Sequence, residues 1–376
     1  MKRYLEEQIA KDLKRKMVLL TGPRQVGKTY MSKQIARKYF NNFCYLNFDN
    51  PIDADVIIGQ KWPRSIDLLI LDEIHKMPGW KNFLKGVYDT KLDECALLVT
   101  GSSRMDTFRQ AGPSLAGRYF HHSLWPISVA ELKSKYQPSI AFEKLQQFGG
   151  FPEPFLSDNL REAKRWRAQY FIDIVREDIL EFGRLQEIRT MRLLLELLRK
   201  RVGSPLSYTS LASDLQASPN TIKNYIQILE ALHIVFLVRP FHKNMARAIQ
   251  KIPKLYFYDS GLVIGDVGLV TENVTAVCLK KYTDFRSETT GEEVRLAYLR
   301  TKEKHEVDFT IIMNDYPETL LEVKTSSSKI TPSLRYIGSK FPLSSKVLLV
   351  KDLRVNQEVD NISICNLSEW LAELEV

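Results

Sequence analysis

The sequence predicts an α/β protein with a parallel sheet in its first third, a helical region, a helix-turn-helix, and a small second α/β region. From Met17 to about Leu132, short apolar runs alternate with amphipathic stretches, which is typical of a parallel α/β layer fold. From Trp125 to about Arg201 the apolar residues recur at helical spacing. Strand-like runs return after Tyr256 and predict the second α/β region.

Length and composition are those of a folded protein with several domains. The chain has 376 residues, more than one ordinary hydrophobic core serves, so two or three domains are expected. Hydrophobic residues make up 44% and charged residues 26%, which argues against a disordered or fibrous protein. The net charge of +9 favours anionic partners such as nucleic acid.

The sequence contains no indication of secretion or of a membrane. The N-terminal residues lack the continuous apolar run of a signal peptide, and no stretch is apolar over the length that spans a bilayer. The cysteines form no close pair, so neither a zinc site nor a disulfide framework is predicted: they are Cys44, Cys95, Cys278 and Cys365. We therefore expect a cytoplasmic protein with no membrane partner.

The expected elements follow from periodicity. The strands of the first sheet are expected at Met17 to Thr21, Phe43 to Phe48, Asp67 to Leu71 and Ala96 to Thr100. In the helical region, Trp166, Tyr170 and Ile174 share one helix face. The last region predicts a helix from about Leu269 to Tyr282 and strands at Ala297 to Arg300, Glu306 to Ile312 and Thr319 to Thr325.

Residues 206–240 predict a helix-turn-helix with a wing. Ser218 is the expected N-cap of the second helix and Pro219 lies in its first turn. Its small core is expected from Leu211, Leu215, Ile222, Ile226 and Leu229. The outward side chains, which either read a DNA groove or form a solvated face, are Asn220, Lys223, Asn224 and Gln227. A basic stretch that favours phosphate contact follows, with Arg239, His242, Lys243, Arg247, Lys251 and Lys254.

A complete phosphate-loop spacing follows the first predicted strand and precedes a helical pattern. The residues are Gly22, Pro23, Arg24, Gln25, Val26, Gly27, Lys28 and Thr29. The glycines let backbone N–H groups face the phosphates, Lys28 neutralises the β and γ oxygens, and the Thr29 hydroxyl ligates Mg²⁺. ATP and Mg²⁺ are therefore the expected cofactors.

Two adjacent acids end the apolar strand that begins at Asp67. Asp72 is expected in the Mg²⁺ shell, and Glu73 is expected to orient and polarise the attacking water. A strand that ends in two acids is often only a solvated terminus, but its position after a phosphate loop favours the catalytic interpretation.

The ordered motifs resemble the AAA+ superfamily and, more closely, a prokaryotic ATPase family that joins such a domain to an uncharacterised C-terminal region. The matching stretches are TGPRQVGKT, LLILDEIHK, LLVTGSS, SLAGR, GGFPE, IVREDI, IKNYIQILE, KLYFYDSGL, EVDF and EVK. The domains expected are an ATPase core at 1–132, a helical lid or connector at 133–203, a winged helix-turn-helix at 204–255 and a nuclease-like α/β domain at 256–376.

The resemblance implies further residues of the ATP site. Ser102 is the expected sensor of the γ-phosphate, with Thr100 and Ser103 as rivals. Arg118 is expected as an arginine finger that acts on a neighbouring subunit in a homo-oligomeric ring, and a structural ion pair is its alternative. Two positions remain open: Pro113 precedes Ser114 where relatives carry an acid, and Arg176 is a weakly supported choice for a second sensor.

The C-terminal region resembles the core of the PD-(D/E)xK nucleases. Strand alternation puts Glu322 and Lys324 on one face, beside Asp308 of the adjoining strand. The resemblance adds Glu272 on the preceding helix. Together the carboxylates are expected to hold Mg²⁺ while Lys324 positions a water. The alternative is a hairpin with a cross-strand Glu–Lys pair in an inert fold.

Three functions follow from these patterns. The first is an AAA+ type ATPase that couples ATP binding and hydrolysis to rearrangement of its winged-helix and nuclease-like domains on DNA. The second is a Mg²⁺-dependent DNA nuclease that ATP switches. The third is a signalling or scaffold protein in which nucleotide controls partner binding.

Overall fold

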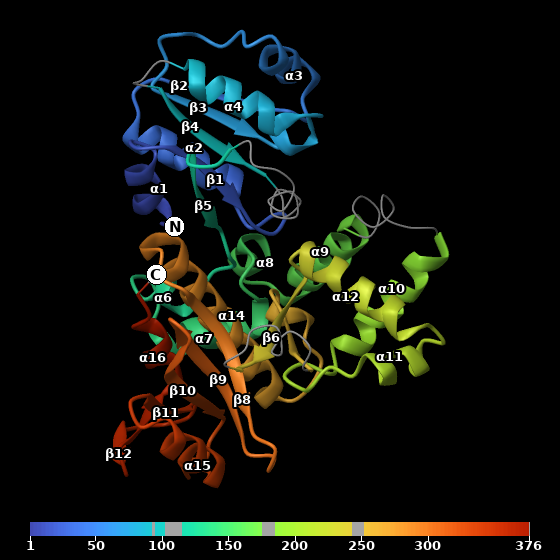
Figure 1. Cartoon of the computed structure of the whole chain (residues 1–376), viewed down its shortest axis with the longest axis vertical. Helices are drawn as coiled ribbons and strands as arrows, with labels where there is room; N and C mark the ends of the chain where they lie inside the picture. The colour runs from blue at the N-terminus through green and yellow to red at the C-terminus, as the bar shows by residue number, and fades with distance from the viewer. Residues whose placement is uncertain (92–94, 102–114, 175–184, 243–251, 376) are drawn as a thin grey trace. The chain divides into compact units, whose positions relative to one another are not determined.

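The chain folds into two compact units, Met1–Trp125 and Pro126–Val376 (Figure 1). The computed structural model describes residues 1–91, 95–101, 115–174, 185–242 and 252–375. Within these ranges no helix is both long and apolar enough to cross a membrane. All four cysteines are free thiols.

The first unit is built on a parallel sheet with the strand order β2-β3-β4-β1-β5. The strands are β1 (Met17–Thr21), β2 (Phe43–Asn47), β3 (Leu68–Asp72), β4 (Ala96–Thr100) and β5 (Tyr119–Ser123). The four predicted strands are confirmed to within a residue or two, and β5 was not predicted. Every residue of β1, β3 and β4 is buried, which explains their continuous apolar runs.

Helices complete the first unit. They are α1 (Glu6–Asp12), α2 (Lys28–Tyr39), α3 (Pro51–Ile58), the 3₁₀ turn η1 (Ile74–Lys76) and α4 (Trp80–Thr90). One buried cluster joins alternate residues of the strands, such as Leu69, Leu71 and Leu97, to Trp80 and Leu84 of α4. This packing holds α4 and η1 against the strands β3 and β4.

The first part of the second unit is helical. Its helices are α6 (Val129–Leu132), α7 (Pro138–Phe148), α8 (Pro152–Ser157), α9 (Leu160–Ile174) and α10 (Leu185–Leu198), then α11 (Tyr208–Asp214) and α12 (Pro219–Ala231). On α9 the rings of Trp166 and Tyr170 stack 4.6 Å apart, as their spacing predicted. The Ser218 hydroxyl accepts a hydrogen bond from the Thr221 N–H and Pro219 opens α12, which confirms the expected cap.

The second unit also contains a mixed sheet with the order β12-β13-β11-β10-β9-β8-β6-β7. The strands are β6 (Val235–Pro240), β7 (Lys254–Phe257), β8 (Val294–Arg300), β9 (Glu306–Met313), β10 (Tyr316–Lys324), β11 (Ser345–Val350), β12 (Gln357–Val359) and β13 (Ile362–Asn366). The remaining elements are the 3₁₀ turn η3 (Ser260–Leu262), α14 (Val267–Thr290), α15 (Pro332–Lys340) and α16 (Leu367–Ala372).

The predicted wing and the C-terminal region share this one sheet. Strand β6 pairs in parallel with β8 through Arg239 and Ala297, and β7 pairs with β6. The expected domain boundary after residue 255 therefore falls inside β7. The boundary was misplaced because the backbone of β6 forms hydrogen bonds with β8, a strand that begins more than fifty residues later in the chain. The sequence does not reveal this pairing.

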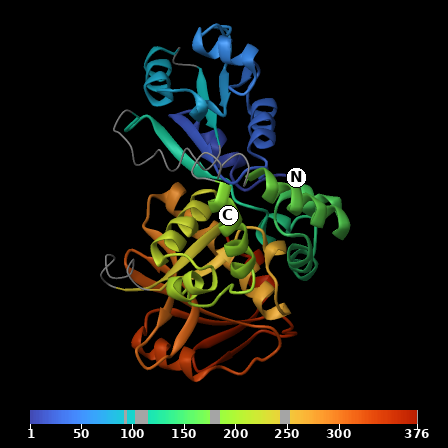
Figure 2. The same cartoon turned by 90° about the vertical axis from the view of Figure 1, so that its right-hand side faces the viewer.

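The C-terminal elements run in the order α14, β8, β9, β10, α15, β11. Strands β8, β9 and β10 form an antiparallel meander, and β11 returns parallel to β10. Helix α14 contacts β7, β8 and β10, and α15 contacts β9 and β10. Figure 1 labels these elements, and Figure 2 shows the chain turned by 90°. A buried cluster that includes Leu320, Leu334 and Leu348 joins α15 to the sheet.

Candidate functional site

The loop between β1 and α2 has a backbone that glycine makes possible. Gly22 has φ 142°, and a Cβ there would lie 2.3 Å from the carbonyl oxygen of Leu124. Gly27, which precedes α2, has φ 99°, also in the left-handed region. These two conformations turn the chain from the end of β1 into the start of the helix, as the phosphate-loop motif predicts.

Lys28 lies in the first turn of α2 and folds back over the loop. Its side-chain Nζ donates to the carbonyl oxygens of Gly22 at 3.0 Å and Pro23 at 2.7 Å, and the residue is only 7% exposed. An ammonium held by carbonyl groups beside a helix N-terminus creates a concentrated positive field. This field is suited to an anion.

Asp72 is a buried carboxylate at the end of β3 that accepts hydrogen bonds from three hydroxyl groups. The Thr29 Oγ1 donates to Oδ2 at 2.7 Å, and the Tyr45 hydroxyl donates to the same oxygen at 2.8 Å. The Thr100 hydroxyl donates to Oδ1. Thr29 and Asp72, each expected at the Mg²⁺, are thus in direct contact, and Thr100, a rival for the sensor role, also binds Asp72.

The Thr29–Asp72 pair offers oxygen ligands of the kind that Mg²⁺ prefers. Its donor set fits the ion that the phosphate-loop motif implies, because a hydroxyl and a carboxylate meet next to the loop.

Tyr45 was missed by the sequence interpretation. It lies on β2, the neighbour of β3, and burial together with Asp72 raises the pKa of its phenol. The ammonium of Lys33 lies over the Tyr45 ring, 3.9 Å from its centroid, in a cation–π contact. The sequence marks Tyr45 only as a polar aromatic residue within a predicted strand, because the pairing of β2 with β3 is not visible there.

Tyr45→Phe is expected to lower the free energy of unfolding of the first unit by about 1.5 kcal/mol, because it removes a hydrogen bond to a buried carboxylate. Urea unfolding would measure the loss. Tyr39→Phe, which alters an exposed tyrosine of α2, is the control and should leave the unfolding midpoint unchanged. Equal midpoints for wild type and both variants would contradict the prediction.

Glu73 follows Asp72 in a left-handed conformation with φ 55°. Its backbone N–H donates to the Thr100 carbonyl at 2.9 Å, which fixes this bend. The carboxylate lies 3.9 Å from the Nζ of Lys76, and Lys76 in turn binds Asp49 at 2.6 Å. Burial raises the pKa of Glu73, while Lys28 opposes the shift. The Nε2 of His75 lies 3.7 Å from the same carboxylate, so neither His75 nor Lys76 is within hydrogen-bonding distance of Glu73.

Arg118 makes an ion pair within its own chain. Its Nε lies 2.8 Å from the carboxylate of Asp89 on α4, and a second nitrogen donates to the same carboxylate at 3.1 Å. This is the structural alternative named for Arg118, and it keeps the guanidinium partly exposed. The predicted sensor Ser102, its rival Ser103, the Pro113–Ser114 position and Arg176 lie outside the described residues.

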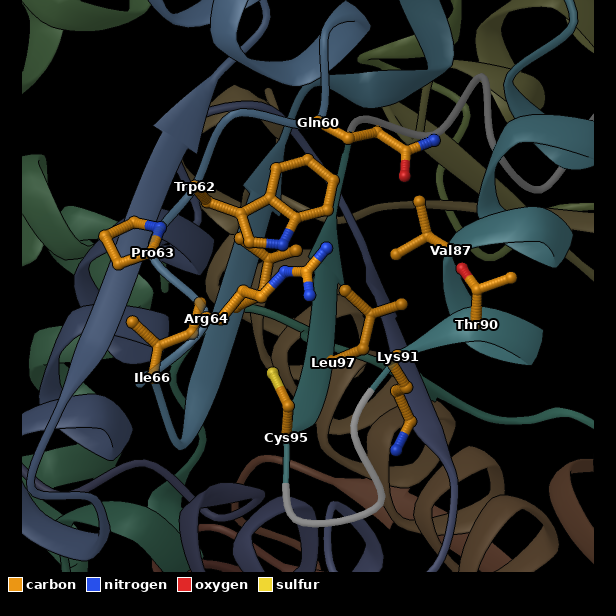
Figure 3. A pocket seen from close by; sticks show the side chains of 11 residues that line it. Gln60, Trp62, Pro63, Arg64, Ile66, Val87, Thr90, Lys91, Cys95 and Leu97 are labelled. Carbon is orange, nitrogen blue, oxygen red and sulfur yellow. The ribbon is translucent and has the colours of Figure 1, made fainter.

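The cavity in Figure 3 lies away from the phosphate loop. It has a volume of about 310 Å³ and is lined by residues such as Trp62, Arg64 and Leu97, with Cys95 at the start of β4. The loop and Asp72 lie at the carboxyl ends of the strands, where parallel α/β sheets bind ligands. Shape alone therefore does not locate the site that the chemistry indicates.

The predicted acids of the C-terminal sheet have close partners. Glu322 is buried, accepts from the Thr331 hydroxyl at 2.6 Å and lies 3.0 Å from the Nζ of Lys324. Asp308 accepts from the backbone N–H of Val323 at 2.9 Å. Glu322 and Lys324 thus share one side of β10, as predicted. In the described part of the chain, no three His, Cys, Asp or Glu residues are grouped so that they could hold a metal ion.

Lys254, on β7, was expected in a basic stretch that favours phosphate contact. It is instead buried, and its Nζ lies 2.7 Å from Glu306 and 3.9 Å from both Glu272 and Asp308. Burial opposes its charge, but these carboxylates outweigh burial and raise the pKa of Lys254. Burial also raises the pKa of Asp308 and of Glu272.

The predicted helix-turn-helix, formed by α11 and α12, presents the expected polar face. Four of its five predicted core residues are fully buried, namely Leu211, Ile222, Ile226 and Leu229, whereas Leu215 is only half-buried. The four outward residues on α12 are exposed: Asn220, Lys223, Asn224 and Gln227. Of the basic stretch, Lys243, Arg247 and Lys251 lie outside the described residues.

A parallel sheet, a phosphate loop and an acid-ended β3 define a P-loop nucleotide-binding domain. Residues 14–133 match a family model described as an AAA domain, which supports the AAA+ type, and residues 140–271 match a model described as a domain of unknown function. This match and the geometry of the loop support a P-loop domain of the AAA+ type in the N-terminal unit.

Two proteins that are similar in sequence to this chain are described as uncharacterized. One, from Mycobacterium tuberculosis, is 26% identical over 89% of this chain and 79% of its own length. Another, from Methanocaldococcus jannaschii, is 25% identical over 79% of this chain and 72% of its own length.

Among solved structures, the Thermotoga maritima RuvB Holliday junction branch migration motor has a TM-score of 0.34 at 18% identity, over 62% of this chain and 88% of that one. The Bacillus subtilis DNA clamp loader delta protein has a TM-score of 0.28 at 12% identity, over 60% and 88%. The support for an AAA+ type domain comes from the family match to residues 14–133 and from the sheet and loop themselves.

Proposed function

We propose that this chain is an ATP-binding and ATP-hydrolysing protein of the AAA+ type, whose nucleotide state controls its helix-turn-helix and C-terminal sheet on DNA. The meeting of Thr29 with Asp72 carries the proposal, because their side-chain oxygens lie 2.7 Å apart beside the phosphate loop. These residues are more than forty positions apart in the sequence, so their contact is independent of either motif taken alone.

Phosphate binding is assigned to the loop and to Lys28. The left-handed turn at Gly27 directs backbone N–H groups to one side of the loop, where the start of α2 adds its positive end. Lys28 would exchange the carbonyl oxygens of Gly22 and Pro23 for phosphate oxygens. The loop would thus supply hydrogen-bond donors, and Lys28 a positive charge, to a bound phosphate group.

Thr29 and Asp72 would hold the magnesium ion that accompanies ATP, and when bound the ion neutralises charge on the phosphates. The adjacent Glu73 carboxylate would orient the attacking water and accept its proton. Lys76 lies 3.9 Å from Glu73 and steadies it without a direct hydrogen bond, so the carboxylate keeps its acceptor capacity.

Two further assignments belong to the same proposal. Arg118 would leave Asp89 and act on the phosphates of a neighbouring subunit in a ring, and its partly exposed side chain supports this role. DNA contact is assigned to the exposed face of α12, with Lys223 as its cation, and the net charge of +9 favours an anionic partner. Ser102 is kept as the proposed sensor.

For the C-terminal elements we infer the fold of the PD-(D/E)xK nucleases. The order of a helix, an antiparallel three-strand meander, a helix and a fourth strand parallel to the third supports it. So does the position of Asp308 on β9 beside Glu322 and Lys324 on β10. A fold of this kind does not by itself imply cleavage.

The test is ATP hydrolysis by the purified chain in Mg²⁺, with and without duplex or branched DNA, followed as phosphate release. Glu73→Gln is expected to lower turnover by about 10²-fold or more because it removes the proton acceptor. Binding of a fluorescent ATP analogue should persist, since Glu73 is not assigned to phosphate binding. DNA should raise the turnover of the wild type.

Glu7→Gln is the matched control, because Glu7 is an exposed acid of the same unit and pairs with the exposed Lys2 at 2.6 Å. Its turnover should equal that of the wild type. Turnover that Glu73→Gln retains would overturn the assignment of this residue. If ATP binds but neither turnover nor a DNA response is detected, the nucleotide-switched scaffold becomes the better interpretation.

A further inference from the structure

An internal cation lies among the acids of the C-terminal sheet. Lys254 comes from β7, whereas Glu272 comes from α14 and Glu306 and Asp308 come from β9. The Lys254 Nζ lies 2.7 Å from Glu306 and 3.9 Å from each of the other two carboxylates. The lysine is 2% exposed. A single buried ammonium thus lies close to three carboxylates.

The surrounding groups complete the hydrogen bonding of these acids. The Tyr256 hydroxyl donates to Glu272 at 2.6 Å, and the Val323 N–H donates to Asp308 at 2.9 Å. Buried charges are tolerated when they are paired and hydrogen-bonded. The acids around Lys254 therefore meet that requirement with protein groups alone.

Glu322, the remaining predicted metal ligand, has other partners. Glu322 accepts from the Thr331 hydroxyl at 2.6 Å and pairs with Lys324 at 3.0 Å. A divalent ion in a nuclease-like site needs carboxylate oxygens within about 2.0–2.6 Å of one point. Such a point among Glu272, Asp308 and Glu306 would lie next to the Lys254 ammonium, and the two positive charges would repel each other.

We propose that the Lys254 ammonium is the built-in cation of this acidic cluster and takes the place of the divalent metal that the nuclease-like fold implies. The cluster, here Glu272, Glu306 and Asp308 with Lys254, then serves to hold α14, β7 and β9 together. The C-terminal sheet accordingly does not cut a phosphodiester through a metal. This inference rests on the proposed fold and not on the ATPase proposal.

The test is binding of Mn²⁺, used alone as a stand-in for Mg²⁺ and followed by its electron paramagnetic resonance signal in nucleotide-free full-length protein. The wild type should bind no ion that depends on Asp308. In the present geometry the three carboxylates are arranged around the ammonium and not around an ion. Lys254→Met, which keeps the length of the side chain and removes its charge, should let them move around an added ion, so it should gain about one Mn²⁺ per chain, at least about tenfold tighter than any wild-type binding. That gain should disappear in the Lys254→Met, Asp308→Asn double variant.

Lys254→Arg is the matched control, because it keeps a cation in place, and it should gain no Mn²⁺. Two results would overturn the proposal: a wild-type Mn²⁺ site that Asp308→Asn abolishes, or a folded Lys254→Met protein that gains no site. If Lys254→Met does not fold, Mn²⁺ binding is compared between the wild type and Asp308→Asn, and Lys254→Gln replaces Lys254→Met as the variant that should gain the site. None of these variants touches residues 22–29, so ATP turnover reports separately on the proposed ATPase.

Discussion

Lys28→Ala is expected to lower phosphate release from ATP by about 10²–10³-fold, because it removes a cation that stabilises charge on the transferred phosphoryl group. The residue is 7% exposed and its ammonium already lies at the loop, where it would exchange two carbonyl oxygens for phosphate oxygens. Turnover at saturating ATP and the affinity for a fluorescent ATP analogue should both be measured, since the lysine acts on the bound nucleotide and on the transition state.

Arg37→Ala is the control for this substitution, because Arg37 is an exposed cation on the same helix, α2. It should change neither turnover nor affinity. Circular dichroism would establish that both variants fold. Turnover in Lys28→Ala within a few-fold of the wild type would mean that another site binds the phosphates, and the proposed role of the loop would fail.

The nucleotide site could be predicted from the sequence because its signals are local. Strand β1, the loop and the start of α2 follow one another within about a dozen residues, and the two acids directly end β3. Buried parallel strands read as continuous apolar runs, so their positions were also visible. The cap formed by Ser218 and Pro219 is local in the same sense.

What the sequence did not reveal depends on contacts between distant segments. Tyr45 reaches Asp72 only because β2 and β3 are neighbours in the sheet. Lys254 looks like one cation in a basic stretch, and only the pairing of β6 with both β7 and β8 brings it among the acids of α14 and β9. Periodicity predicts a strand but not its partner.

Arg118 illustrates the same limit for function. Its sequence context implies a role toward another subunit, and the fold adds Asp89 on α4 as an intramolecular partner. The two roles are compatible, because an exposed ion pair is weak and can open when a stronger anion is offered. A phosphate group in a neighbouring site would be such an anion, so Asp89 would hold the guanidinium ready while the chain is alone.

Arg167→Met is expected to lower the free energy of unfolding of the second unit by about 3–5 kcal/mol, because it leaves a buried carboxylate without its cation. The Arg167 Nε donates to Asp259 at 2.6 Å, and the two side chains are 9% and 2% exposed. A second nitrogen of Arg167 donates to the carbonyl oxygen of Phe148. Urea unfolding of the full-length protein, followed in the transition that belongs to this unit, measures the loss.

Arg201→Met is the matched control, since Arg201 pairs with Asp214 in the same unit but both side chains are well exposed, and its loss should stay within about 1 kcal/mol. Equal losses in the two variants would contradict the prediction.

The same ion pair explains two sequence motifs, GGFPE and YDSGL. A Cβ at Gly149 would lie 1.9 Å from the Asp259 carboxylate, and one at Gly261 would lie 2.0 Å from the Arg167 guanidinium. Both glycines leave room for a buried ion pair, so these motifs are explained by packing and require no catalytic role.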